Sequence, residues 1–263
     1  MKMINGIAVF EDGHKNNKPL VFIHGFPFDH TMWRNQVEFL KQNYYCITYD
    51  IRGLGQSEPG DGQYTIDGFA DDLFQIIDEL KLIKPVICGL SMGGYIALRA
   101  LERDQARFGG VVLMSTKAQA DDNAGKLKRA EGIKKINSRG IEEFIAGFVP
   151  NCFGDIAQTE MKDMYEDTLQ KSMKSSPAGV KGCLLAMAGR TDTDTFLEKI
   201  EIPALVLPGS IDKLIPADVM RRMSEKIKDS EFAAAPRAGH LTPLENPDFV
   251  NDVLAGFLNR RIK

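Results

Sequence analysis

The sequence predicts an α/β domain in which a mostly parallel sheet has helices on both faces and a helical segment inserted late in the chain. Three observations predict it. Apolar strand-like runs alternate with helical patterns up to Ser115, residues 117–190 contain helical patterns without a convincing strand, and strand patterns then resume at PALVLPG. The 263 residues are enough for one large domain of this class.

The first half of the chain supplies most of the expected sheet. The predicted strands are residues 2–10, 20–24, 44–50, 86–89 and 110–115. Helices are predicted between them at 31–42, 66–80 and 93–103. The middle helix has the clearest pattern, because its apolar residues recur every three or four positions: Ile66, Phe69, Leu73, Ile77 and Leu80.

The insertion is predicted to be a lid on the same domain, because core strands return after it at 203–209 and 230–236, followed by a helix over 247–259. The predicted division is a core of residues 1–116 and 191–263 with a helical cap of residues 117–190. The Lys-rich stretch 126–135 is interleaved with apolar residues and is interpreted as the solvated face of an amphipathic helix. The apolar face is predicted to contain Leu127, Ala130, Ile133 and Ile136.

Composition excludes several other classes of function. A formal net charge of -3 provides no basic surface for nucleic acid. No stretch is long and apolar enough for a membrane span, and the first residues lack the apolar core of a secretory signal. The four cysteines form no CxxC pair and show no metal-ligand spacing, so neither a disulfide framework nor a metal site is expected. The expected location is the cytoplasm.

The most informative stretch is VICGLSMGGYIAL, residues 86–98, in which Ser91 stands between glycines where a strand gives way to a helix. Gly89 and Gly93 make the pattern G-x-S-x-G, which is typical of a sharp strand-to-helix turn that exposes a nucleophilic serine. An ordinary Gly-Ser turn is the alternative, but the strand before and the helix after favour the nucleophile. The helix N-terminus would also stabilise developing negative charge.

A serine nucleophile needs a base and an acid that orients the base. On this scaffold the expected chain order is serine, acid, histidine, and His240 is the only histidine after Ser91. Asp212 follows the strand PALVLPG directly and is the predicted acid, which would fix the tautomer of His240. The less favoured acids do not directly follow a strong strand: Asp192, Asp194, Asp218 and Asp229.

Together these residues resemble the α/β-hydrolase family, over nearly the whole chain outside the insertion. The resemblance implies an eight-stranded, mostly parallel sheet. The segment HGFP, which begins at His24, is similar to the family's H-G-x-P loop, so the backbone N–H groups of Phe26 and Met92 would form the oxyanion hole and His24 would shape the loop. DIRGLGQS, residues 50–57, resembles a structural signature of the family that carries no chemistry.

Within the family, the chain looks closest to small carboxylesterases, enol-lactonases and cofactor-free haloperoxidases. Related epoxide hydrolases and dehalogenases have aspartate where this chain has Ser91, so their covalent step is not expected. The resemblance implies a serine esterase that acts on small to medium apolar acyl groups without a cofactor. Lactone opening, thioester hydrolysis, C–C cleavage and perhydrolysis remain alternatives at the same serine, and a ligand receptor with a slow triad is a further one.

The substrate is therefore expected to be a small-molecule ester in an apolar pocket. Methionines and phenylalanines of the insertion could line that pocket, or they could simply pack its helices together. The candidate pocket residues are Phe28, Phe144, Phe148, Leu214 and Leu241.

Overall fold

The computed structural model describes residues 1–262, and within them the chain forms one eight-stranded sheet in the order β1-β2-β4-β3-β5-β6-β7-β8. The antiparallel pairs are β1 with β2 and β2 with β4, and all other neighbours are parallel. The predicted fold class is confirmed. The strands are β1 (Lys2–Ile4), β2 (Ile7–Asp12), β3 (Pro19–Ile23), β4 (Tyr45–Tyr49), β5 (Val86–Leu90), β6 (Gly110–Met114), β7 (Ala204–Leu207) and β8 (Ser230–Phe232).

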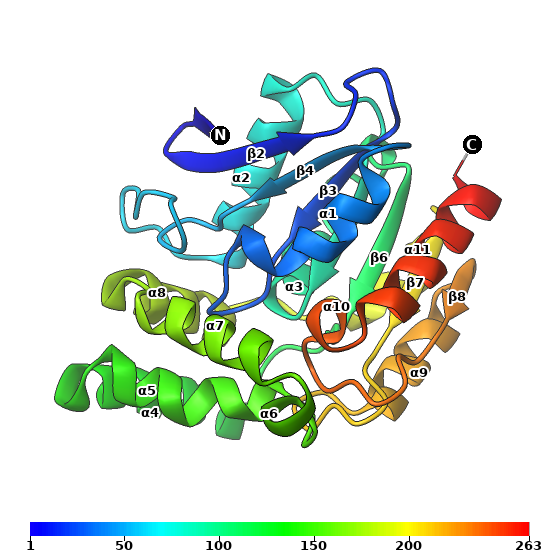
Figure 1. Ribbon diagram of the computed structural model, residues 1–263. Coiled ribbons are helices and arrows are strands. Elements are labelled where there is room, and N and C mark those ends of the chain that lie inside the picture. Colours follow the sequence, from blue (N-terminus) through cyan, green and yellow to red (C-terminus); the bar gives the residue numbers. More distant parts are fainter. Residues whose placement is uncertain (263) are drawn as a thin grey trace.

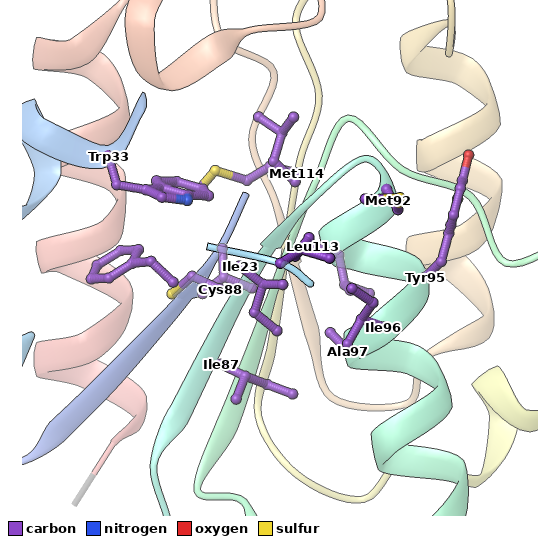
Figure 2. Close-up of a cluster of buried hydrophobic side chains, with 14 of the residues drawn as sticks. Ile23, Trp33, Ile87, Cys88, Met92, Tyr95, Ile96, Ala97, Leu113 and Met114 are labelled. Atoms are coloured by element: carbon purple, nitrogen blue, oxygen red, sulfur yellow. The ribbon is translucent and has the colours of Figure 1, made fainter. Parts of the chain in front are cut away.

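The central strands are apolar along their whole length because helices cover both of their faces. Every residue of β5 and β6 is buried. Leu113 and Met114 are neighbours in β6 and point to opposite faces, Leu113 toward Ile96 in the helix between β5 and β6, and Met114 toward Trp33 (Figure 2). The parallel register pairs Leu90 with Met114, so the carboxyl ends of β5 and β6 end at the same edge of the sheet.

Two layers of helices enclose the sheet. The helices of the core are α1 (Arg34–Leu40), α2 (Ile66–Glu79), α3 (Met92–Asp104), α9 (Ala217–Lys226), α10 (Thr242–Glu245) and α11 (Pro247–Arg261). On one face α2 packs against α3, and on the other α1 packs against α11 (Figure 1). Among the helices described, none combines the length and the apolar character that a membrane span requires.

The segment between β6 and β7 is helical, as expected. Its helices are α4 (Asn123–Arg139), α5 (Ile141–Phe148), α6 (Ala157–Glu160), α7 (Lys162–Met173) and α8 (Pro177–Ala188). Helix α4 packs against α8 and α5, and α5 also packs against α7. These helices lie beside the edge of the sheet toward which the arrowhead of β6 points (Figure 1). The insertion therefore faces the carboxyl ends of the strands.

The predicted apolar face of α4 is wrong in its first half. Ile136 is the only buried residue of α4, whereas Leu127 is 65% exposed and Ala130 is exposed as well. A helix turns by about 100° per residue, so two residues nine positions apart lie on opposite sides of it. Only the end of α4 that contains Ile136 is buried, and its lysines are solvated as predicted.

Most predicted boundaries differ from the structure by a few residues at most, and three elements differ in a way that has a clear structural description. The strand predicted over residues 2–10 is a hairpin, because Asn5 and Gly6 both have positive φ (46° and 81°) and form a two-residue turn. The helix predicted over 31–42 begins as a 3₁₀ turn and ends earlier. The strand predicted over 230–236 pairs only as far as Phe232, apart from one isolated bridge further on.

All four cysteines lie within the described residues, where they are buried and free. They are Cys46, Cys88, Cys152 and Cys183. Burial raises the pKa of each thiol, to about 12 for Cys46. They pack as small apolar side chains.

Candidate active site

The turn between β5 and α3 holds Ser91 in strained backbone geometry. Its φ is +54° and its ψ is -113°, a region that non-glycine residues rarely adopt. The backbone is fixed on both sides, since Ser91 N donates to Met114 O (2.9 Å) and Ser91 O accepts from Thr116 Oγ1 (2.8 Å). The strain is thus maintained by the strand next to β5.

The glycines beside Ser91 are required by close approach of the backbone. A Cβ at position 89 would lie 2.4 Å from Gly93 O, and a Cβ at position 93 would lie 2.1 Å from Ile23 O. Both distances are far below van der Waals contact, so no side chain fits at either position. Sequence reasoning predicted this turn, and the geometry gives its physical cause.

Asp212 and His240 meet at the same edge of the sheet, although 28 residues separate them. His240 Nδ1 lies 2.8 Å from Asp212 Oδ2, and both side chains are almost completely buried. Since a carboxylate only accepts, Nδ1 carries the proton and Nε2 is left as an acceptor. The arrangement is the one expected for a base held by an acid.

The environment of Asp212 keeps its carboxylate ionised. Burial alone would raise its pKa, but the adjacent His240 and the backbone N–H groups of Leu214 and Ile215 outweigh burial and lower the pKa of Asp212. These two N–H groups donate to Oδ1 at 2.8 and 3.0 Å, which leaves Oδ2 for the imidazole. The other candidate acids bond to other partners and do not contact His240: Asp192, Asp194, Asp218 and Asp229.

Ser91 and His240 line one cavity of about 480 Å³. They form no direct hydrogen bond in the part of the chain described, which is common before a substrate is bound. Seven large apolar side chains from the core and the insertion line the same cavity: Phe26, Phe144, Phe148, Leu184, Met187, Leu214 and Ile215. A volume of this size suits a small organic molecule.

Two of the five predicted pocket residues do not line this cavity. Phe28 faces a separate cavity between the loop after β3 and α7, and Leu241 is fully buried in the core. The chain turns sharply after Phe26, where Phe28 N donates back to Gly25 O, so the side chain of Phe28 projects elsewhere. Phe144, Phe148 and Leu214 do line the cavity.

The aromatic contacts show how the insertion reaches the site. The rings of Phe144 and Phe148 stack at a centroid distance of 5.7 Å, and both meet the Phe26 ring edge-on, at 6.3 and 5.5 Å. Such contacts stabilise aromatic pairs beyond simple burial. Helix α5 thus packs against the loop after β3, and the three rings line the cavity.

That loop also fixes the direction of the Phe26 N–H. His24 is fully buried: its Nδ1 donates to Gly25 O (2.8 Å) and its Nε2 accepts from Ile51 N (2.8 Å). The C=O of Gly25 and the N–H of Phe26 belong to one planar peptide group and point in opposite directions. Because the Gly25 carbonyl points toward His24 Nδ1, the Phe26 N–H points away from His24. Burial lowers the pKa of His24, which favours the neutral ring that this pair of bonds needs.

The same loop lies against the Ser91 turn. A Cβ at position 25 would lie 3.4 Å from Ser91 Cβ, so the backbone at Gly25 passes next to the serine. Met92 N is the first amide of α3, and the first N–H groups of a helix have no carbonyl of the same helix to which they can donate. Neither the Phe26 nor the Met92 amide donates to an acceptor among residues 1–262.

Asp50 fastens the loop from its other end. Its Oδ1 accepts from His30 N (2.7 Å) and lies 2.8 Å from His30 Nδ1, while Oδ2 accepts from Gln56 N (2.8 Å). Asp29, His30 and Asp50 bring possible metal-ligand atoms within 4.8 Å of one another. The hydrogen bonds within the group already account for this proximity.

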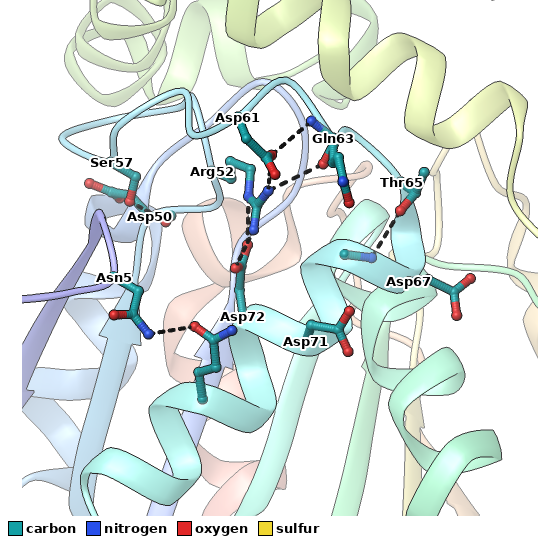
Figure 3. A network of polar contacts seen from close by, with 12 residues as sticks. Asn5, Asp50, Arg52, Ser57, Asp61, Gln63, Thr65, Asp67, Asp71 and Asp72 are labelled. Atoms are coloured by element: carbon teal, nitrogen blue, oxygen red, sulfur yellow. Dashed lines mark hydrogen bonds and ion pairs between the residues drawn. The ribbon is translucent and has the colours of Figure 1, made fainter.

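The segment DIRGLGQS has a structural role, as predicted. Arg52 forms two hydrogen bonds with Asp72 of α2, at 2.7 and 3.1 Å, and a third with Asp61 (Figure 3). Ser57 Oγ donates to Asp50 O and accepts from Ala8 N. These bonds tie the loop after β4 to β2 and α2.

A buried carboxylate that sequence reasoning missed supports the His240 loop. Glu245 is 2% exposed, and it accepts from Leu241 N (3.0 Å) and from Gly154 N in the insertion (2.7 Å). His240 N in turn donates to Cys152 O (3.0 Å). The spacing of Glu245 in HLTPLE gave no signal of these bonds, because one partner is remote in sequence. The loop that carries His240 is therefore fastened to the insertion.

The fold and the site together define a class of protein. A family model described as the alpha/beta hydrolase fold matches residues 18–247, and the chain belongs to this family. A thermophilic esterase from Thermogutta terrifontis, solved with malate bound, has 31% sequence identity and a TM-score of 0.94, with 98% of this chain and 94% of that chain covered.

The names of other relatives describe different activities. The chain is 29% identical to 3-oxoadipate enol-lactonase 1 of Acinetobacter baylyi, over 96% of this chain and 92% of the relative. It is 30% identical to a putative non-heme chloroperoxidase of a Synechocystis species, over 96% of this chain and 95% of the relative. These similarities support hydrolase activity as the general class.

Proposed function

We propose that this protein is a serine-dependent carboxylic ester hydrolase. The observation that carries the proposal is the cavity shared by Ser91 and His240, with His240 paired to Asp212 on its far side. A serine, an imidazole and a carboxylate in this relation are the groups required for acyl transfer.

In the proposed mechanism, His240 Nε2 takes the proton of Ser91 Oγ as the oxygen attacks the ester carbonyl. The carbonyl oxygen becomes an oxyanion that accepts from the N–H groups of Phe26 and Met92. His240 then gives its proton to the leaving alcohol. Water, deprotonated by the same imidazole, attacks the acyl-enzyme and releases the acid. Throughout, Asp212 stabilises the protonated imidazole.

The wall contributed by α5 and α8 supports an apolar acyl group of small to medium size, and we assign residues 117–190 as a lid over the site. Lactone opening is the second candidate, since a cyclic ester needs the same groups and a relative is named an enol-lactonase. Thioesters, C–C bonds and perhydrolysis use the same serine and are tested in the same way.

A panel of 4-nitrophenyl esters from acetate to dodecanoate tests the proposal. We expect kcat/KM to be greatest for intermediate chains and to fall at dodecanoate, because a cavity of about 480 Å³ has little room for a twelve-carbon acyl chain. Parallel assays with γ- and δ-lactones rank the second candidate. Absence of turnover on every ester would refute the esterase assignment.

A substitution at Glu245 tests the support of the His240 loop. Glu245→Gln keeps the shape of the side chain, but its NH₂ group cannot accept from the backbone N–H that the lost oxygen served. We expect kcat to fall by about 10- to 100-fold, as for small misplacements of catalytic groups. Asp248→Asn, an exposed change just beyond Glu245, is the control and should leave kcat unchanged. Equal rates for both variants would contradict the positioning role.

The difference in stability between the wild type and Glu245→Gln should depend on pH. Burial raises the pKa of Glu245 despite its N–H donors, so the folded protein takes up this proton at a higher pH than the unfolded chain. The wild type should therefore gain stability relative to Glu245→Gln as the pH falls through the raised pKa, and the gain is complete below the unfolded value of about 4.3. Urea unfolding of both proteins between pH 7 and pH 4 measures the difference. A difference that is constant with pH would contradict the assignment.

A further inference from the structure

One side of the Ser91 cavity is unlike the apolar wall and has no part in the mechanism above. Three cationic side chains line it: Lys117 after β6, and Lys128 and Arg129 in the first half of α4. The chain as a whole carries a net charge of -3, so this concentration of positive charge does not reflect the general composition.

The local charges do not cancel. The buried carboxylate of Asp121 is shared by Arg190 (2.9 Å), Arg129 (3.0 Å) and Lys117 (3.7 Å), so one negative charge faces three positive ones. Lys128 forms no ion pair within the described part of the chain. Asp122 also lines the cavity, but it is exposed and its Oδ1 caps α4 by accepting from Gly125 N (2.7 Å). The cavity therefore has an excess of positive charge.

Tyr95 of α3 lines the same cavity. Tyr95 is 6% exposed, and its ring lies under the guanidinium of Arg190, 4.2 Å from the ring centroid. Its hydroxyl points away from the core cluster (Figure 2) and has no hydrogen-bond partner among residues 1–262. Lys128 and the Tyr95 hydroxyl are thus two unused donors on one cavity.

We propose that the cationic side of this cavity binds a carboxylate group of the substrate, so that the preferred substrate is an ester or lactone that carries one negative charge. The inference rests on the proposed esterase function and names its substrate class. Because Arg129 is already paired with Asp121, Lys128 is the cation available to the ligand, and a single charge suits it better than the dianion of a phosphate. Charge-assisted bonds of this kind are stronger than neutral ones.

A matched pair of esters tests the inference. Mono(4-nitrophenyl) adipate and 4-nitrophenyl hexanoate have the same acyl length and differ in the terminal carboxylate. We expect the wild type to have a higher kcat/KM for the adipate ester at low ionic strength, and we expect salt to reduce this preference. In Lys128→Glu the ratio of the two kcat/KM values should fall by about 10-fold or more. Lys126→Glu, on the same helix but outside the cavity, should leave the ratio unchanged.

A binding measurement separates this inference from the proposed function, because it needs no turnover. Isothermal titration of Ser91→Ala with monomethyl adipate, methyl hexanoate and inorganic phosphate should show monomethyl adipate, which carries one carboxylate, bound most tightly. Lys128→Glu in that background should weaken the binding of monomethyl adipate selectively. Hydrolysis of both 4-nitrophenyl esters with no effect of Lys128→Glu on the ratio would overturn the carboxylate site and leave the esterase standing. Tight binding of monomethyl adipate without hydrolysis of either 4-nitrophenyl ester would support the site and overturn the esterase. Phosphate bound more tightly than monomethyl adipate would overturn the carboxylate assignment.

Discussion

Ser91→Ala is expected to lower kcat/KM for 4-nitrophenyl butanoate by about 10⁴- to 10⁶-fold, the range found when a nucleophile is removed from such a triad. The loss follows from the proposed mechanism, since without Oγ no acyl-enzyme forms and only the backbone donors and His240 remain to assist water. The strained turn itself should persist, because its geometry depends on Gly89, Gly93 and backbone bonds. Steady-state kinetics together with the melting temperature of each protein measure both effects.

Ser115 offers a matched control for this substitution. It occupies the corresponding position after β6, is buried, and also has a positive φ, +42°. Its hydroxyl has no hydrogen-bond partner among the described residues and does not line the Ser91 cavity. Ser115→Ala should therefore keep wild-type kinetics. Wild-type activity in Ser91→Ala would show that another residue is the nucleophile.

The sheet and the residues at its carboxyl edge could be predicted because the relevant signals are local. The apolar run before Ser91 and the apolar run before Asp212 each mark a parallel strand, and parallel strands end at one edge of a sheet. Residues that follow directly are then brought together whatever their separation in sequence. His240 needed only the additional fact that it is the last histidine.

The wall of the cavity could not be predicted in the same way, because distant helices build it. Phe28 was expected to line the pocket from its closeness to Phe26, yet the turn between them directs the two rings into different cavities. The carboxylate of Glu245 links the His240 loop to the insertion through Gly154, which lies 91 positions earlier in the chain. Nothing in the local pattern of either segment records such a contact.

The cationic side of the cavity could not be predicted from the local sequence either. The lysines spaced along α4 predict a solvated helix face, and Lys126 is exposed to solvent as this interpretation requires. Lys128 differs only because the first half of α4 passes beside the mouth of the Ser91 cavity. The direction of one exposed lysine depends on how α4 packs on α8, which depends in turn on residues far from both.

Asp212→Asn is expected to lower kcat by about 10³- to 10⁴-fold through a change in the tautomer of His240. The asparagine Oδ1 can still accept from Leu214 N and Ile215 N, so its NH₂ group is left to face His240 Nδ1. That group donates, so Nδ1 must accept and the ring proton moves to Nε2. An imidazole protonated at Nε2 cannot take the proton of Ser91.

This reasoning separates a catalytic role of Asp212 from a structural one. Because both loop hydrogen bonds survive, the melting temperature at neutral pH should change far less than kcat. The lowered pKa of Asp212 means that its ionised form stabilises the folded protein above the unfolded pKa of about 3.9, and that this stability is lost as the pH falls through the lowered folded value. Asp212→Asn should remove that part of the acid sensitivity, whereas Asp248→Asn, an exposed change outside the site, should change neither kcat nor acid unfolding. If Asp212→Asn unfolded the protein at neutral pH, or left kcat intact, the carboxylate would be holding the loop and another group would have to orient His240.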